Sequence, residues 1–124
     1  FREVPRVLQE SSILLLLTNQ GRDGILTTKA FEYMGARRPI LCVPGDGGEL
    51  DALLASTHTG VSCASVDSAV DQILEWHAEW RATGTVRWGG SEEAIAPYTR
   101  RHQAGQLAEI LNRTVAKHHA QTSR

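Results

Sequence analysis

The sequence of 124 residues lacks features that several classes of protein require. Its 13 basic and 14 acidic residues are interspersed, and the formal net charge is -1. A basic field suited to nucleic acid is therefore absent, and we predict no nucleic-acid partner. The apolar run from Ile13 to Leu17 is far too short to span a bilayer. The chain starts at Phe1 with neither an initiator Met nor a signal peptide, so we expect it to belong to a longer protein.

Cysteine is also scarce. The only two, Cys42 and Cys63, lie in apolar surroundings without the spacing of a zinc site, and the five histidines form no metal-binding pattern. We predict no metal site and two buried, reduced thiols. Reduced thiols fit the cytoplasm, and attachment of the full-length protein to a membrane surface is the alternative location.

What the sequence does contain is a set of short, continuous apolar runs. Ile13–Leu17 and Pro39–Val43 do not alternate polar with apolar residues, which is typical of strands buried on both faces in a parallel sheet. Thr27–Ala36, between them, reads as a helix. These three segments predict a βαβ unit with a right-handed crossover. Val61–Ala64 predicts a short third strand.

The remaining segments predict helices. A leucine-rich helix follows the turn at 45–48. Asp67 or Ser68 is expected to cap the next helix, and Ser91 the last helical region, which should kink near Pro97. The tail, 117–124, is polar and expected to fray.

These elements predict an α/β fold, a three-layer Rossmann-like domain with a mostly parallel sheet. The domain covers residues 1–116. Because three strands make a narrow sheet with an exposed edge, we expect the domain to be incomplete relative to its full form.

The loop after the first strand is the best candidate for a binding site, because open α/β sheets bind ligands beyond the carboxyl ends of their strands. It leads to Thr27 and Thr28, either of which can cap the following helix, whose first turn favours an anion such as a diphosphate. Lys29 opposes the helix dipole there, which a bound phosphate would offset. The alternative is that Lys29 points into solvent or pairs with Glu32.

Glu32 is the second candidate. It lies too far into the helix to complete a capping box. A carboxylate there can accept hydrogen bonds from the two adjacent hydroxyls of a ribose. The competing interpretation is that Glu32 is an ion-pair partner of Lys29, Arg37 or Arg38.

The run TKAFEYMGARRPIL, from Thr28 to Leu41, resembles the donor-site helix and following strand of GT-B glycosyltransferases of the retaining, group-1 type. The likeness extends more loosely to Gly60, Val61 and the run from Tyr98 to Arg101. It implies that the chain is the C-terminal, nucleotide-sugar-binding domain of such an enzyme.

The resemblance also implies a role for each site residue. One position departs from the pattern, because many members carry an additional glutamate where this chain has Gly24. The implied contacts are Glu32 with the ribose; Thr27, Thr28 and Lys29 with the diphosphate; and the backbone of Gly24, Ile25 and Leu26 with the sugar or phosphate.

The predicted function is part of a glycosyltransferase that moves a sugar from a nucleotide-diphosphate donor to an unidentified acceptor. The donor is a substrate, and no separate cofactor is expected. The family's N-terminal lobe would be the missing partner, so we predict no transferase activity from this chain alone and assign no catalytic residue. The alternatives are a sugar-nucleotide epimerase-like domain or a non-catalytic α/β interaction module, with self-association through the exposed sheet edge or the last helix.

Overall fold

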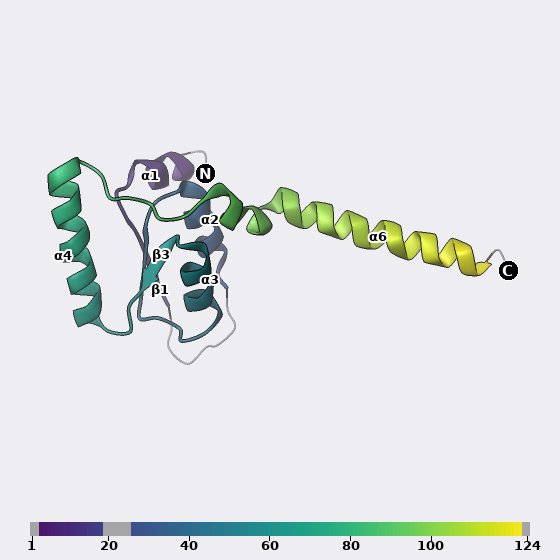
Figure 1. Cartoon of the computed structure of the whole chain (residues 1–124), viewed down its shortest axis with the longest axis horizontal. Helices are drawn as coiled ribbons and strands as arrows, with labels where there is room; N and C mark the ends of the chain where they lie inside the picture. Colours follow the sequence, from purple (N-terminus) through teal and green to yellow (C-terminus); the bar gives the residue numbers. More distant parts are fainter. Residues whose placement is uncertain (1–2, 19–25, 123–124) are drawn as a thin grey trace.

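The computed structural model describes residues 3–18 and 26–122 and shows a mixed α/β fold (Figure 1). Three parallel strands, β1 (Leu14–Leu17), β2 (Ile40–Val43) and β3 (Gly60–Ser62), form one sheet in the order β1-β2-β3. Leu14 pairs with Ile40, which in turn pairs with Gly60. The predicted Rossmann-like α/β class and parallel sheet are confirmed.

Helices cover both faces of this sheet. Each of the two connections between strands contains one helix, and the remaining helices follow β3, except for α1, which precedes β1. The predicted break near Pro97 is present as a short 3₁₀ helix, η1. The helices are α1 (Val4–Glu10), α2 (Thr28–Ala36), α3 (Glu49–Thr57), α4 (Val66–Thr83), α5 (Glu92–Ile95), η1 (Ala96–Tyr98) and α6 (Arg100–Thr122).

The core has two parts, one on each face of the sheet. The larger part packs α2 and α3 against the sheet, and the smaller part packs α4 against the other face. Both cysteines are buried and free, as the sequence predicts. The larger part comprises Leu16, Ala30, Met34, Ile40, Cys42, Leu50, Leu53, Leu54 and Ile95; the smaller comprises Leu41, Cys63 and Ala69, with Val43, Val61 and Trp76 against them.

The cap of α4 differs from the prediction. Ser65, in extended conformation, is the N-cap, and its hydroxyl accepts a hydrogen bond from the backbone N–H of Ser68. The Ser68 hydroxyl in turn accepts one from the backbone N–H of Ser65, which completes a capping box. Asp67 lies inside the first turn, where its negative charge interacts favourably with the helix dipole.

The end of α2 is tied to two distant segments. Arg37, in the left-handed conformation with φ 55°, closes the helix, and its guanidinium pairs with Glu92 of α5. Arg38 donates from Nε to the backbone carbonyl of Gln9 at 2.7 Å. These contacts hold α1 and α5 beside α2.

Helix α6 projects away from the rest of the molecule (Figure 1). Every side chain from Arg100 to His118 is exposed. The helix continues to Thr122, so it includes most of the segment that was expected to fray. No helix in the described part of the chain combines the length and apolar character needed to cross a membrane.

Candidate functional site

The carboxyl ends of β1 and β2 lie side by side, as an α/β binding site requires. The hydroxyl of Thr18, directly after β1, donates a hydrogen bond to the carbonyl of Pro44, directly after β2. Of the predicted site residues in the connecting loop, Gly24 and Ile25 lie outside the described residues. Leu26 is half-buried and packs against the larger part of the core, directly before Thr27, the N-cap of α2.

The first turn of α2 offers backbone donors that the side chain of its N-cap residue does not cap. Thr27 is the N-cap in extended conformation, but its hydroxyl forms no capping hydrogen bond. That hydroxyl oxygen is buried and has no hydrogen-bond partner among residues 3–18 and 26–122. Thr28 and Lys29 are exposed in the same turn. Because the first N–H groups of a helix have no partner within it, this turn can bind an anion.

A cavity of about 280 Å³ lies between α2 and the segment that leads into α6. The rings of Phe31 and Tyr98 lie against each other along it, with centroids 6.2 Å apart. Carboxylate, hydroxyl and guanidinium groups therefore share one cavity with aromatic rings. Its lining residues are Thr28, Phe31, Glu32, Met34, Gly35, Ile95, Tyr98, Thr99 and Arg100.

Glu32 lies at the boundary of two cavities. It lines the cavity beside Tyr98 and also a second cavity, of about 340 Å³, between α1 and α2. The alternative prediction, that Glu32 is an ion-pair partner of Lys29, Arg37 or Arg38, is wrong. Arg37 pairs instead with Glu92, and Arg38 donates to the carbonyl of Gln9. Within residues 3–18 and 26–122, the side chain of Glu32 forms no ion pair, and neither does that of Lys29.

The turn after β2 is built to cap α3. The carboxylate of Asp46 accepts hydrogen bonds from the backbone N–H groups of Gly48, Leu50 and Asp51 at 2.9–3.1 Å. Burial acts to raise the pKa of Asp46, but these hydrogen bonds stabilise the carboxylate and bring its pKa below the usual value. Asp46 therefore serves the fold and is engaged within the turn.

Asp51 completes this network. Its carboxylate accepts hydrogen bonds from the backbone N–H of Gly47 at 2.9 Å and from the hydroxyl of Ser62 on β3. A Cβ added to Gly45 would lie 2.4 Å from the Ser62 hydroxyl and 2.7 Å from a carboxylate oxygen of Asp51, so a side chain there would displace both groups. The turn at 45–48 is thus packed against α3 and β3, which holds its backbone in place beside the carboxyl ends of β1 and β2.

Sequence reasoning missed that Thr99 and Arg100 share a cavity with Glu32, although it singled out the run that contains them. The Thr99 hydroxyl donates to the carbonyl of Ala96 at 2.8 Å and accepts from the N–H of His102 at 3.3 Å, so it caps α6. Arg100 follows in the first turn. The signal in the sequence is the Pro97 break followed by a hydroxyl residue, which predicts that a new helix starts there. Its position beside α2 is seen only in the structure.

The chain was compared with known proteins by sequence and by structure. No family model matches it, and no curated protein or solved structure is significantly similar to it. In the described part of the chain, no group of histidine, cysteine, aspartate or glutamate side chains is arranged to hold a metal ion. The assignment of a function therefore depends on the site's own geometry and chemistry.

Proposed function

We propose that the chain forms the donor-binding part of a glycosyltransferase, and that the cavity beside α2 receives the nucleoside of a nucleotide-diphosphate sugar. One observation carries the proposal: Glu32, which has no ion-pair partner in the described part of the chain, shares a cavity with Phe31, Tyr98 and Arg100. A carboxylate beside aromatic rings suits a ribose, because its oxygens accept from adjacent hydroxyls while the rings contact the apolar face of a sugar or base.

The spacing along α2 supports the same ligand. Thr28 and Glu32 are four residues apart, which is about 6 Å along a helix axis. A ribose held at Glu32 would then place its 5′ diphosphate near the first turn of α2. The helix dipole, the unpaired N–H groups and the charge of Lys29 would all stabilise it there.

The same arrangement favours group transfer. When the bond between the anomeric carbon and the diphosphate breaks, negative charge grows on the leaving diphosphate oxygen. A helix N-terminus and Lys29 are fixed positive groups at that point, and they stabilise the transition state more than the bound donor. The acceptor's hydroxyl oxygen would form the new bond to the anomeric carbon and give up its proton, which the leaving diphosphate oxygen can accept. The lobe that binds the acceptor would come from outside this chain.

Donor binding tests the proposal. Nucleoside diphosphates and their sugar conjugates are titrated against the chain by calorimetry. Glu32→Ala should weaken binding about 10- to 100-fold, because it removes charge-assisted hydrogen bonds worth about 1.5–3 kcal/mol. The affinity of the Glu32→Gln chain should lie between those of the unmodified and Glu32→Ala chains, since its amide keeps one acceptor.

The matched control is Glu75→Gln, an exposed carboxylate on α4, which packs on the other face of the sheet. It should bind donor as the unmodified chain does. Equal affinity of the Glu32→Ala and unmodified chains would reject the ribose assignment. Failure of every nucleotide to bind would reject the donor site itself.

A further inference from the structure

Helix α6 carries an apolar stripe on which nothing in the described part of the chain packs. Leu107, Ile110, Leu111 and Val115 are each more than half exposed, and their spacing of three and four residues places them on one side of the helix. A lone helix in water is only marginally stable, and most helices in proteins gain their stability from packing of such a face. The stripe therefore requires a surface to cover it.

A second uncovered apolar surface lies on the sheet, on the face that carries α4. Leu15 and Leu17 pair with Leu41 and Val43, so they point to the face of the sheet on which α4 packs. Leu41 is buried beneath that layer, but Leu15 is 51% and Leu17 is 68% exposed. The face of β1 beside α4 thus lacks the helix that a three-layer sheet places over each strand.

Helix α4 extends this uncovered surface. Val70, Ile73 and Leu74 are exposed on α4, and Ile73 lines a groove together with Ile13, which directly precedes β1. We call the set Leu15, Leu17, Val70, Ile73 and Leu74 the β1–α4 surface. Two helices packed side by side on a sheet make contacts of this kind, so the surface has the form of an empty helix position.

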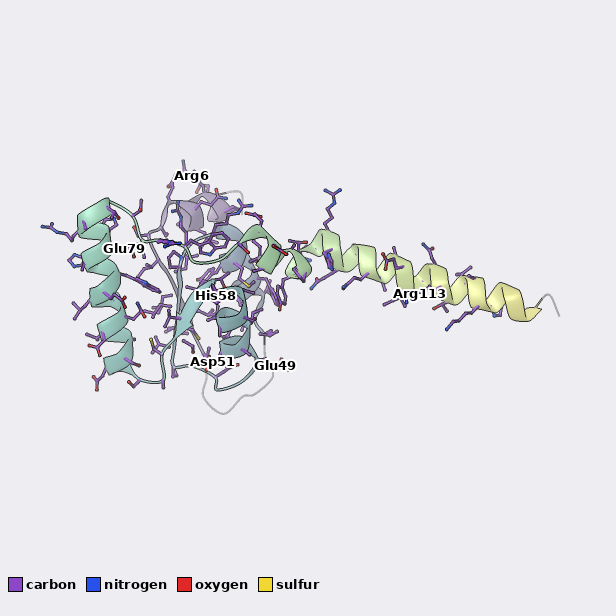
Figure 2. The ribbon with its side chains drawn as sticks, in the orientation of Figure 1. Arg6, Glu49, Asp51, His58, Glu79 and Arg113 are labelled. Atoms are coloured by element: carbon purple, nitrogen blue, oxygen red, sulfur yellow. The ribbon has the colours of Figure 1, made fainter. Side chains whose placement is uncertain are left out.

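The chain's own α6 is not placed to fill that position. It starts at Arg100, directly after η1, whose Tyr98 packs against the larger part of the core on the α2 and α3 face. Figure 1 shows α4 and α6 at opposite ends of the molecule. Figure 2 shows Glu79 of α4 and Arg113 of α6 correspondingly far apart.

Charge identifies the occupant. Helix α4 is acidic, and Asp67, Asp71 and Glu75 recur every four residues, so they form a row. Helix α6 is basic, so two α6 helices would repel each other, whereas α6 and α4 would attract. The charged residues of α4 are Asp67, Asp71, Glu75, Glu79 and Arg81; those of α6 are Arg100, Arg101, Glu109, Arg113 and Lys117.

We propose that two copies of this chain exchange α6, so that each α6 fills the β1–α4 surface of the other copy. Leu107, Leu111 and Val115 cover Leu15 and Leu17 of the second copy. Arg113 and Lys117, which follow one another along the flank of the stripe, lie beside the acidic row of α4. The exchange is reciprocal, which gives a closed dimer with two equivalent contacts.

Composition favours a protein surface over a lipid one. A helix that binds the membrane surface usually pairs basic residues with Trp or Phe on its apolar side. Helix α6 contains no aromatic residue other than histidine, and its apolar stripe is narrow, with alanines at 104 and 108 beside it. This inference does not depend on donor binding, because the cavity beside Glu32 lies on the other face of the sheet.

Paired charge reversals test the exchange. One variant carries Arg113→Glu and Lys117→Glu, and the other carries Asp67→Lys and Asp71→Lys. Mass is measured by sedimentation equilibrium over a wide concentration range. The unmodified chain should dimerise, and each variant alone should associate at least tenfold more weakly, because like charges then meet at both contacts.

A mixture of the two charge-reversal variants gives the decisive test. In an equal mixture of the two variants, each reversed α6 meets a reversed α4 and each unmodified α6 meets an unmodified α4, so the dimer should return. A control with Glu10→Lys and Glu49→Lys, on α1 and α3, should dimerise as the unmodified chain does. Circular dichroism checks that every variant is folded.

Other outcomes would overturn the proposal. An unmodified chain that stays monomeric at every concentration excludes the exchange. So do variants that dimerise alone, or a mixture that does not restore the dimer. A monomer that sediments with vesicles of anionic phospholipid, but not with neutral vesicles, would instead assign α6 to a membrane surface.

Discussion

Asp46 shows how one side chain organises the turn after β2. Its two carboxylate oxygens accept three backbone N–H groups where α3 begins, at a position where Gly48, the N-cap, has no side chain to do so. The lowered pKa of Asp46 means that the folded state prefers the carboxylate over the acid. Protonation of this group therefore costs stability.

Replacing Asp46 tests this role. We expect Asp46→Ala to lower the free energy of unfolding by about 1–2 kcal/mol at neutral pH, as loss of a helix cap does. The contribution of Asp46 is fully present above the pKa of an unfolded aspartate, about 3.9, and is lost as pH falls through the lower folded-state pKa. Urea unfolding at neutral pH and near pH 3 should thus show a smaller acid-induced loss in the variant.

Glu49→Ala is the matched control, because Glu49 lies in the first turn of α3 but accepts none of these hydrogen bonds. It should change stability by less than about 1 kcal/mol, the usual limit of an exposed charge near a helix dipole. If both variants lose equal stability with the same pH dependence, the dipole rather than the hydrogen bonds explains Asp46.

Sequence patterns predicted individual residues well where local chemistry decides. The burial of Cys42 follows from its apolar neighbours, and in the structure desolvation raises the pKa of this thiol to about 11. The lack of an ion pair at Glu32 was not predictable from the sequence. Its candidate partners Arg37 and Arg38 contact Glu92 and the carbonyl of Gln9 instead. Those contacts join residues far apart in sequence, and no local pattern reports them.

At the scale of elements, β3 depends on close contact with β2. Gly60 pairs with Ile40, and a Cβ added to Gly60 would lie 2.3 Å from the Ile40 carbonyl oxygen and 2.7 Å from its Cβ. Real Cβ atoms do not approach backbone so closely. A side chain at this position must push the two strands apart.

We therefore expect Gly60→Ala to lower the free energy of unfolding by about 1–3 kcal/mol, the range of overpacked cores. Gly105→Ala is the comparison, because Gly105 in α6 has nothing within 4 Å of its added Cβ. That change should leave the chain as stable or raise its helix content, since alanine favours helix by about 1 kcal/mol. Thermal unfolding followed by circular dichroism measures both, and an unaffected Gly60→Ala chain would contradict the close packing.

Element types were predicted more accurately than element ends. Apolar runs identified β1 and β2, and the third strand, predicted at Val61–Ala64, is present at Gly60–Ser62. Helical spacing identified the leucine-rich helix, whose Leu50, Leu53 and Leu54 are buried. The cap of α4 was placed at Asp67 or Ser68, two or three residues too late. Several serines and an acid stand together there, and only the extended backbone of Ser65 decides among them.

At the scale of the molecule, α6 contributes little to the stability of the sheet and its helices. Its side chains are exposed from Arg100 to His118, so ending the chain at Thr99 removes little buried surface. At dilutions where the chain is monomeric, we expect the free energy of unfolding to change by less than about 0.5 kcal/mol. Urea unfolding followed by tryptophan fluorescence is suited to this test, because Trp76, Trp80 and Trp88 all precede the cut.

Ile95→Ala provides the contrast. Ile95 is buried in the larger part of the core, so its truncation should cost about 2–4 kcal/mol, as for other buried aliphatic side chains. A shortened chain as unstable as this variant would show that α6 packs on its own sheet in solution.

The architecture was predictable because β1 and β2 are continuous apolar runs on either side of a segment with helical spacing. The prediction that the strand in Ile13–Leu17 is buried on both faces is wrong for Leu15 and Leu17. Both are exposed, although they have the same composition as the buried Leu14 and Leu16. Which leucines are covered depends on how far the helix layer extends, and that is a property of the assembled molecule. The sequence predicted an open sheet edge but not the uncovered face beside it.

The strand order β1-β2-β3 has a consequence for how the protein is made. The strands lie side by side in the order in which they leave the ribosome, and α2 and α3 pack on the same face of the sheet. Each new strand thus adds to an existing edge and never inserts between earlier strands. We expect β1, α2 and β2 to dock during synthesis, before β3 has emerged. The apolar central strand, β2, would then pair with β1 as soon as it is available.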